Sequence, residues 1–128
     1  MKTLAAIIAS AALCILSGCV ALPTETEISD ADYGEYPENY ESIVKTYYSY
    51  HLTHPNSAEY GNISKPKRYW LGNELDDVYY GYLVCAEVNY RNMLGKDTGF
   101  LKHALLIHND IVVKYVEDGD WWGKPLCQ

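Results

Sequence analysis

The sequence predicts a small α+β domain in which one amphipathic helix packs on an antiparallel meander of three or four strands. Apolar side chains recur at helical spacing over residues 38–52, and they alternate with other side chains over residues 78–90. Two further apolar runs, residues 100–107 and 111–117, are separated by a short polar turn. Packing the helix on the meander buries the apolar side of both, so we place one domain at residues 39–128.

The helix is expected over residues 38–52. Pro37 suits a position at its start, and Glu38 suits the positive end of the helix dipole. One stripe at spacings typical of a helix face holds Tyr40, Ile43, Val44, Tyr47 and His51. Pro55 ends the helix, because the residue before a proline is driven out of the α region.

The strands follow a stretch rich in proline and glycine. Residues 55–77 predict a long loop, with at most a short strand around residues 67–71. In the strand at residues 78–90, one side holds Tyr80, Tyr82, Val84, Ala86, Val88 and Tyr90, which predicts a half-buried strand. The segment His108-Asn109-Asp110 predicts a tight hairpin between the last two strands.

The acidic charge is concentrated before the domain. The chain has a formal net charge of −7, and residues 20–38 contain six Asp or Glu and neither Lys nor Arg. Repulsion between these like charges, together with Pro23 and Pro37, predicts that residues 19–38 form a flexible tether. The alternative is an acidic binding motif. A nucleic-acid partner is excluded by this composition, because phosphate binding needs a basic face.

The first nineteen residues have the pattern of an export signal. Lys2 precedes an apolar stretch of thirteen residues, 4–16, which is too short to span a bilayer. The alternative is that this stretch forms a buried helix. The segment Leu16-Ser17-Gly18-Cys19 resembles the lipobox of bacterial lipoproteins. This resemblance implies that the signal peptide, residues 1–18, is removed and that Cys19 carries two or three acyl chains such as palmitate, which anchor the protein.

The resemblance also implies a location. Val20, where an Asp would signal retention, implies transfer to the outer membrane with the domain facing the periplasm, or anchoring in the cell membrane if the host has a single membrane. Separately, residues 80–92 are similar to a Gly-aromatic-x-Val-Cys strand of small uncharacterised exported proteins from proteobacteria. That similarity implies a small α+β domain and no activity.

Two cysteines remain after export. Cys14 leaves with the signal peptide and Cys19 is lipidated, so Cys85 and Cys127 form an even pair in an oxidising compartment. We expect a disulfide that holds the C-terminal tail on the sheet. Two buried thiols or a redox site are the alternatives, although the chain has no C-x-x-C motif.

The sequence contains no catalytic or metal-binding pattern. The spacing of His51, His54, His103 and His108 does not fit a metal site, and both the G-x-S-x-G and P-loop motifs are missing. We therefore expect no enzyme activity, no cofactor and no metal.

The aromatic residues are numerous, with 13 Tyr and 3 Trp. They either build the core or bind a partner. Trp70, Trp121 and Trp122 are the candidate binding surface, since stacked aromatic rings bind sugars and are frequent at interfaces. We hypothesise a non-enzymatic envelope lipoprotein whose domain binds another envelope component. The alternatives are a peptidoglycan-binding or glycan-binding module and an inhibitor of a lysozyme-like hydrolase.

Overall fold

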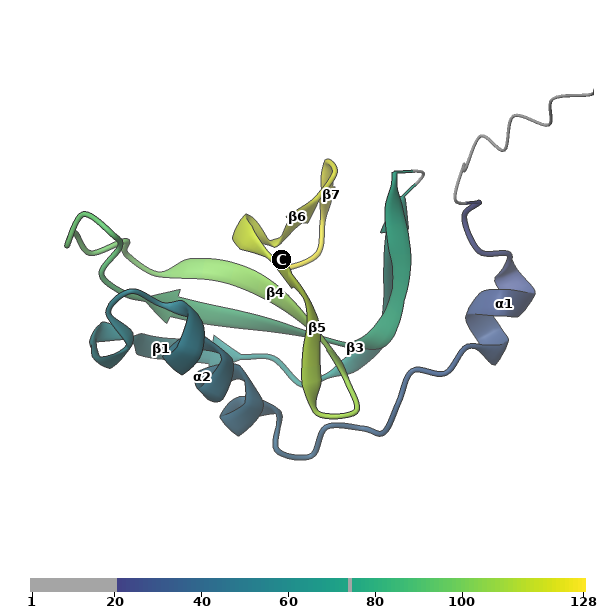
Figure 1. Cartoon of the computed structure of the whole chain (residues 1–128), viewed down its shortest axis with the longest axis horizontal. Coiled ribbons are helices and arrows are strands. Elements are labelled where there is room, and N and C mark those ends of the chain that lie inside the picture. Colours follow the sequence, from purple (N-terminus) through teal and green to yellow (C-terminus); the bar gives the residue numbers. More distant parts are fainter. Residues whose placement is uncertain (1–20, 74) are drawn as a thin grey trace, which may run out of the picture.

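The structure, a computed structural model, describes residues 21–73 and 75–128 (Figure 1). The helices are α1 (Glu25–Asp30) and α2 (Tyr40–His51), with short 3-10 turns at Pro55–Ser57 and Glu117–Gly119. The strands are β1 (Glu59–Ile63), β2 (Lys67–Asn73), β3 (Asp76–Asn89), β4 (Leu101–His108), β5 (Ile111–Val116), β6 (Asp120–Trp121) and β7 (Lys124–Pro125). The predicted α+β class is confirmed. The predicted signal peptide and Cys19 lie outside the described residues.

The long strand β3 organises an antiparallel sheet of five strands. One edge of β3 pairs with β4, and β5 pairs with the other side of β4. The second edge of β3 is shared, because β2 pairs with its first half and β1 with its second half. Asn109 and Asp110 both have positive φ, as the tight turn between β4 and β5 requires.

The number of strands differs from the prediction of three or four. Residues 55–77, expected as a long loop, contain both β1 and β2. Their prolines and glycines fall in the turns or, as Gly61 and Gly72 do, on strands at the outer edge of the sheet. The hydrogen bonds that make these segments strands come from β3, and a local pattern does not show such pairing.

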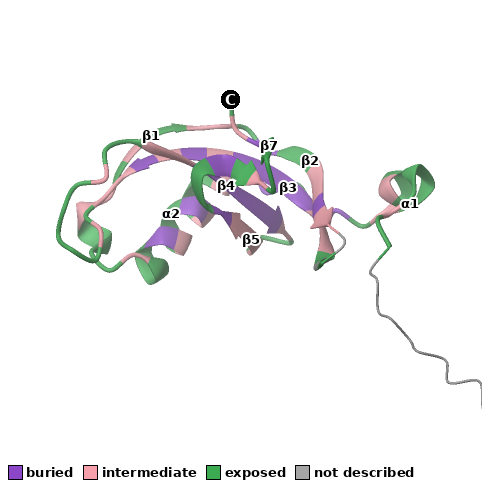
Figure 2. Cartoon of the chain, turned by 90° about the horizontal axis from the view of Figure 1, so that it is seen from above, coloured by how far each residue is buried: buried purple, intermediate pink, exposed green. Residues whose placement is uncertain are grey.

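Helix α2 lies on one face of the sheet. Its Val44 and Tyr48 are buried in a core cluster with residues of β3 and β4, namely Val84, Ala86, Val88, Leu105 and Ile107. Figure 2 shows the buried residues concentrated in β3, β4 and the inner side of α2. We call this side of the sheet the α2 face.

The C-terminal segment covers the opposite side, which we call the tail face. Its core cluster is Leu71, Leu83, Ala104, Leu106, Val116 and Leu126. A disulfide joins Cys85 of β3 to Cys127, with the Cα atoms 5.7 Å apart, so the predicted disulfide is confirmed. The bond holds the last residues of the chain against the sheet.

Residues 33–37 of the predicted tether pack on the domain, whereas α1 before them has no buried residue. Thr24 and Glu27 cap α1 reciprocally, and Tyr33 is only 7% exposed. The rings of Tyr33 and Tyr36 pack edge-on against Tyr80 and Tyr82 of β3, with centroids 5.6 and 5.4 Å apart. Aromatic packing thus holds this part of the segment on the sheet, and the flexible tether as a whole stays a prediction.

Candidate binding site

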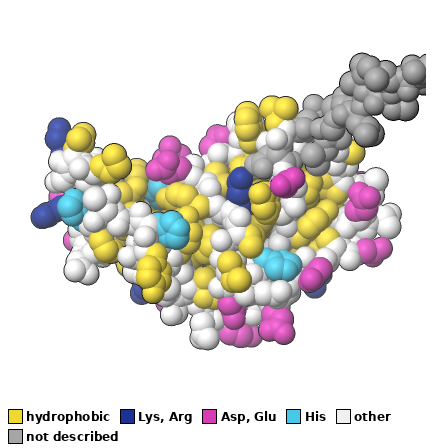
Figure 3. Space-filling view, viewed as in Figure 1, with side chains coloured by type: hydrophobic (Ala, Val, Ile, Leu, Met, Phe, Trp, Pro, Cys, Tyr) yellow, Lys and Arg dark blue, Asp and Glu magenta, His cyan; other side chains and the backbone are white. Residues whose placement is uncertain are grey.

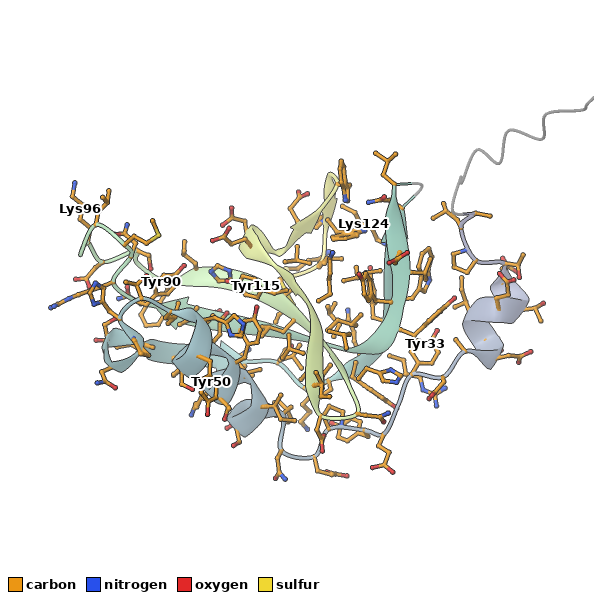
Figure 4. All side chains as sticks on the ribbon, viewed as in Figure 1. Tyr33, Tyr50, Tyr90, Lys96, Tyr115 and Lys124 are labelled. Atoms are coloured by element: carbon orange, nitrogen blue, oxygen red, sulfur yellow. A yellow bond between two sulfur atoms is a disulfide. The ribbon has the colours of Figure 1, made fainter. Side chains whose placement is uncertain are left out.

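The loop between β3 and β4 presents two large apolar side chains to solvent. Met93 is 83% exposed and Leu94 is 80% exposed. We call residues 91–98 the tip loop. It lies at the end of the long axis of the molecule opposite α1, as the position of Lys96 in Figure 4 shows. Two adjacent exposed apolar side chains on a protruding loop are a feature of interaction sites.

The tip loop is held by its own hydrogen bonds. The side-chain oxygen of Asn92 accepts from the backbone N–H groups of Leu94 and Lys96, at 2.9 and 3.2 Å. The Asn92 N–H donates to the Lys96 carbonyl at 2.9 Å, and the Thr98 N–H donates to the Tyr90 carbonyl at 2.9 Å. These bonds fix the conformation in which Met93 and Leu94 are presented.

A pocket of about 280 Å³ opens beside the tip loop, between α2 and β5. We call it the aromatic pocket, because four of its lining residues are Tyr47, Tyr48, Tyr90 and Tyr115. Figure 4 shows Tyr90 and Tyr115 on the side of the sheet where α2 runs, and Figure 3 shows apolar side chains gathered on that side with histidines among them. The remaining lining residues are His51, Leu52, Thr53, Arg91, Asn92, Met93 and Glu117.

A buried polar cluster lies behind the aromatic pocket. His103 of β4 is fully buried, its Nδ1 atom is 2.6 Å from the Tyr115 hydroxyl, and the two rings are stacked. Burial lowers the pKa of His103 and raises the pKa of Tyr48 and Tyr115. His103 is therefore neutral at pH 7, and both tyrosines are protonated.

Two atoms of this cluster have no hydrogen-bond partner among the described residues, the Tyr48 hydroxyl and the His103 Nε2. A buried polar group without a partner costs about 1–3 kcal/mol, so such atoms mark places where a ligand or water is accommodated. Sequence reasoning missed this cluster, because the only functional role it considered for His103 was that of a metal ligand, and it treated the tyrosines as one set. The available signal was His103 itself, a histidine inside the apolar strand Leu101–His108.

Acidic side chains lie at the edge of the aromatic pocket. Glu117 lines the pocket, and Asp118 follows it in the chain. Burial raises the pKa of Tyr90, and the carboxylates of Glu117 and Asp118 add to the rise. Burial also raises the pKa of Tyr115, with a further contribution from Glu117. Glu117 thus places a carboxylate at the pocket wall, which is also lined by the basic residue Arg91.

The three tryptophans of the predicted binding surface do not lie together. Trp70 of β2 is paired with Tyr80 of β3. The next residue, Leu71, belongs to the core cluster of the tail face, so the side chain of Trp70 lies on the other face. Trp121 packs against the tail-face cluster. The Trp121 Nε1–H donates to the Gly72 carbonyl at 3.3 Å, whereas Trp122 is 70% exposed. Trp70 and Trp121 thus lie on opposite faces of the sheet, and the three side chains do not form one continuous surface.

A second cavity, of about 410 Å³, lies on the tail face near the disulfide. It is lined by lysines that have contacts within the chain. Lys102 donates to the Gln128 carbonyl at 2.8 Å. Lys67 and Lys124 both lie over the Tyr69 ring, 5.6 and 5.2 Å from its centroid.

The histidines are scattered. His51 stacks on Tyr47, and the His108 Nδ1–H donates to the Tyr80 carbonyl at 2.9 Å. Within residues 21–73 and 75–128, His, Cys, Asp and Glu side chains form no group of three that could hold a metal ion. In the same ranges, no helix is both long and apolar enough to span a bilayer.

The chain was compared with protein-family models, curated proteins and solved structures, and nothing matches it. The candidate site therefore has to be interpreted from its own chemistry.

Proposed function

We propose that this chain is a lipid-anchored, non-enzymatic envelope protein whose domain binds another envelope protein through the tip loop and the aromatic pocket. The observation that carries the proposal is the position of Met93 and Leu94, exposed on a hydrogen-bonded loop at the end of the molecule opposite α1. The proposed lipid is on Cys19, close in sequence to α1. The tip loop is then the part of the domain that extends away from the anchor.

The energetics of the tip loop favour binding to a protein. Burying a Met or Leu side chain contributes about 1.5–3 kcal/mol, and both side chains are at least 80% exposed. Because the loop is already held by Asn92, little conformational entropy is lost when a partner orders it. Met93 and Leu94 have the properties of an anchor for an apolar pocket on the partner.

The two alternative functions are supported unequally. A peptidoglycan-binding or glycan-binding module built on Trp70, Trp121 and Trp122 loses its main support, because these side chains are divided between two faces of the sheet. An inhibitor of a lysozyme-like hydrolase is a special case of protein binding. The protruding tip loop favours it, since such a loop can enter the cleft of an enzyme.

The test is photo-crosslinking in cells that produce the full chain. A photoreactive amino acid in place of Leu94 should capture a discrete envelope protein, and Met93→Ser in the same chain should reduce that product at least about fivefold. Leu75 is the matched control, a leucine in the β2–β3 turn that is 84% exposed, and should give no such product. Cys19→Ala should release the protein from the membrane fraction.

Absence of a crosslink at Leu94, or the same products at Leu94 and Leu75, would overturn the proposal. If the captured protein is a glycan hydrolase and the full chain inhibits it at micromolar concentration, the inhibitor alternative is the correct form of the function.

A further inference from the structure

Aromatic rings elsewhere in the molecule hold the chain's own cations. Lys45 lies over Tyr60 at 5.3 Å, and Arg68 lies over Tyr33 at 5.3 Å. On the tail face, Lys114 lies over both Tyr79 and Trp121, at 5.1 and 5.0 Å. A cation within about 6 Å of a ring centroid is attracted by the ring quadrupole. The fold thus uses cation–π contacts repeatedly.

The rings of the aromatic pocket differ. Among the described residues, no lysine or arginine is recorded over Tyr47, Tyr48, Tyr90 or Tyr115, although all four line one cavity. The basic residue that lines the pocket is Arg91, and its guanidinium is 3.9 Å from the Asp97 carboxylate. His51 stacks on one face of Tyr47 and His103 on one face of Tyr115, so a cation from outside can approach only the faces that these rings leave open.

Two further groups match the chemistry of such a cation. Glu117 at the pocket wall supplies a carboxylate, the counter-charge that an ammonium or guanidinium group requires when it leaves water. Tyr48 also lines the pocket, is 1% exposed, and has a hydroxyl without a partner among the described residues. Its oxygen can accept an N–H bond, and Lys and Arg side chains are donors only.

We propose that the aromatic pocket binds a lysine or arginine side chain of the partner, with the cation between the tyrosine rings and Glu117. This inference rests on the proposed function and names the chemistry that the partner presents beside the tip loop. Met93 belongs to both features, since it is exposed on the tip loop and also lines the pocket. The partner therefore carries a basic residue next to the apolar pocket that receives Leu94.

The test uses the full-length protein in detergent micelles, with ¹³C-labelled tyrosine rings observed by NMR. Nα-acetyl-lysine methylamide and Nα-acetyl-arginine methylamide are the probes, and Nα-acetyl-norleucine methylamide is the neutral control of matched shape. At least one cationic probe should shift the ring signals of Tyr47, Tyr90 and Tyr115 saturably, with a dissociation constant on the order of millimolar. The neutral probe should bind at least about tenfold more weakly.

Two variants make the assignment specific. Glu117→Gln should weaken binding of the better cationic probe about five- to tenfold, because it removes the counter-charge and keeps the shape. Tyr48→Phe should weaken it about two- to fivefold, because the hydroxyl acceptor is lost while the ring stays. Glu38→Gln, an exposed acidic residue before α2, is the control and should have no effect.

Equal binding of the norleucine and cationic probes would overturn the inference and identify the pocket as apolar. No saturable shift with either cationic probe, or an unchanged affinity in Glu117→Gln, would overturn it as well. Failure here is distinguishable from failure of the proposed function. If Leu94 still crosslinks a discrete envelope protein, the binding role stands and only the cation is wrong.

Discussion

Both faces of the sheet bury a core cluster, but the side chains that complete each cluster differ in chemistry. On the tail face an aliphatic cluster is closed covalently by Cys85–Cys127, and Lys114 covers the rings of Tyr79 and Trp121. On the α2 face the buried His103 and Tyr48 each have one polar atom without a partner among the described residues, beside an open pocket. The tail face is therefore closed by a covalent bond, whereas the α2 face keeps the pocket that we propose as a binding site.

The largest effect is expected from the disulfide. Replacing both cysteines, Cys85→Ser and Cys127→Ser, should lower the free energy of unfolding by about 4 kcal/mol, because residues 42 positions apart are no longer linked in the unfolded chain. Urea unfolding of the oxidised protein and of the double variant measures this. A loss below about 1 kcal/mol would mean that the tail stays in place without the bond.

Leu105 and Leu106 are the matched controls, since these fully buried neighbours on β4 point to opposite faces. Leu105→Ala and Leu106→Ala should each cost about 2–5 kcal/mol in the oxidised protein. Without the disulfide, the cost of Leu106→Ala should shrink and that of Leu105→Ala should not, because only Leu106 packs beneath the tail.

A smaller effect is expected from pH through His103. Burial holds its pKa below the usual value of about 6.5, so below that pH the unfolded chain binds a proton that the native protein does not. The free energy of unfolding should therefore fall as the pH falls from about 6.5 to the native pKa, by at most about 1.4 kcal/mol per pH unit. Urea unfolding at several pH values measures the slope.

The control replaces the hydrogen-bonded pair together, with His103→Phe and Tyr115→Phe, so that neither ring is left without its partner. The slope of this double variant should be shallower than that of the original chain. An unchanged slope would show that His103 does not contribute to the pH dependence.

The smallest effect is expected from Tyr48→Phe. The substitution removes a buried hydroxyl that has no partner among the described residues, so the free energy of unfolding should stay constant or rise by up to about 1 kcal/mol. Tyr115→Phe is the comparison, and it should cost about 1 kcal/mol because its hydroxyl bonds His103. A loss of more than about 1 kcal/mol in Tyr48→Phe would show that its hydroxyl is bonded in the native protein.

Much of the fold could be predicted because single segments show their own periodicity. Helical spacing marked α2 to within two residues at its start, and alternation marked β3 and the hairpin of β4 and β5. The lipobox resemblance, which assigns Cys14 to the signal peptide and Cys19 to the lipid, left Cys85 and Cys127 as the pair that the structure joins. The candidate site could not be predicted in the same way, because the exposure of Met93 and Leu94 and the grouping of the tyrosines around one pocket depend on tertiary packing.

By itself, the sequence determined the α+β class, the helix, the tight turn at Asn109 and Asp110, and the cysteine pair, because each depends on local spacing or on composition. Only the tertiary structure decided that β1 and β2 share one edge of β3, that Tyr33 anchors the acidic segment, and that tyrosines from α2, β5 and the end of β3 surround one pocket. These features depend on which segments meet and in what register, and that choice is made by packing between residues far apart in the chain.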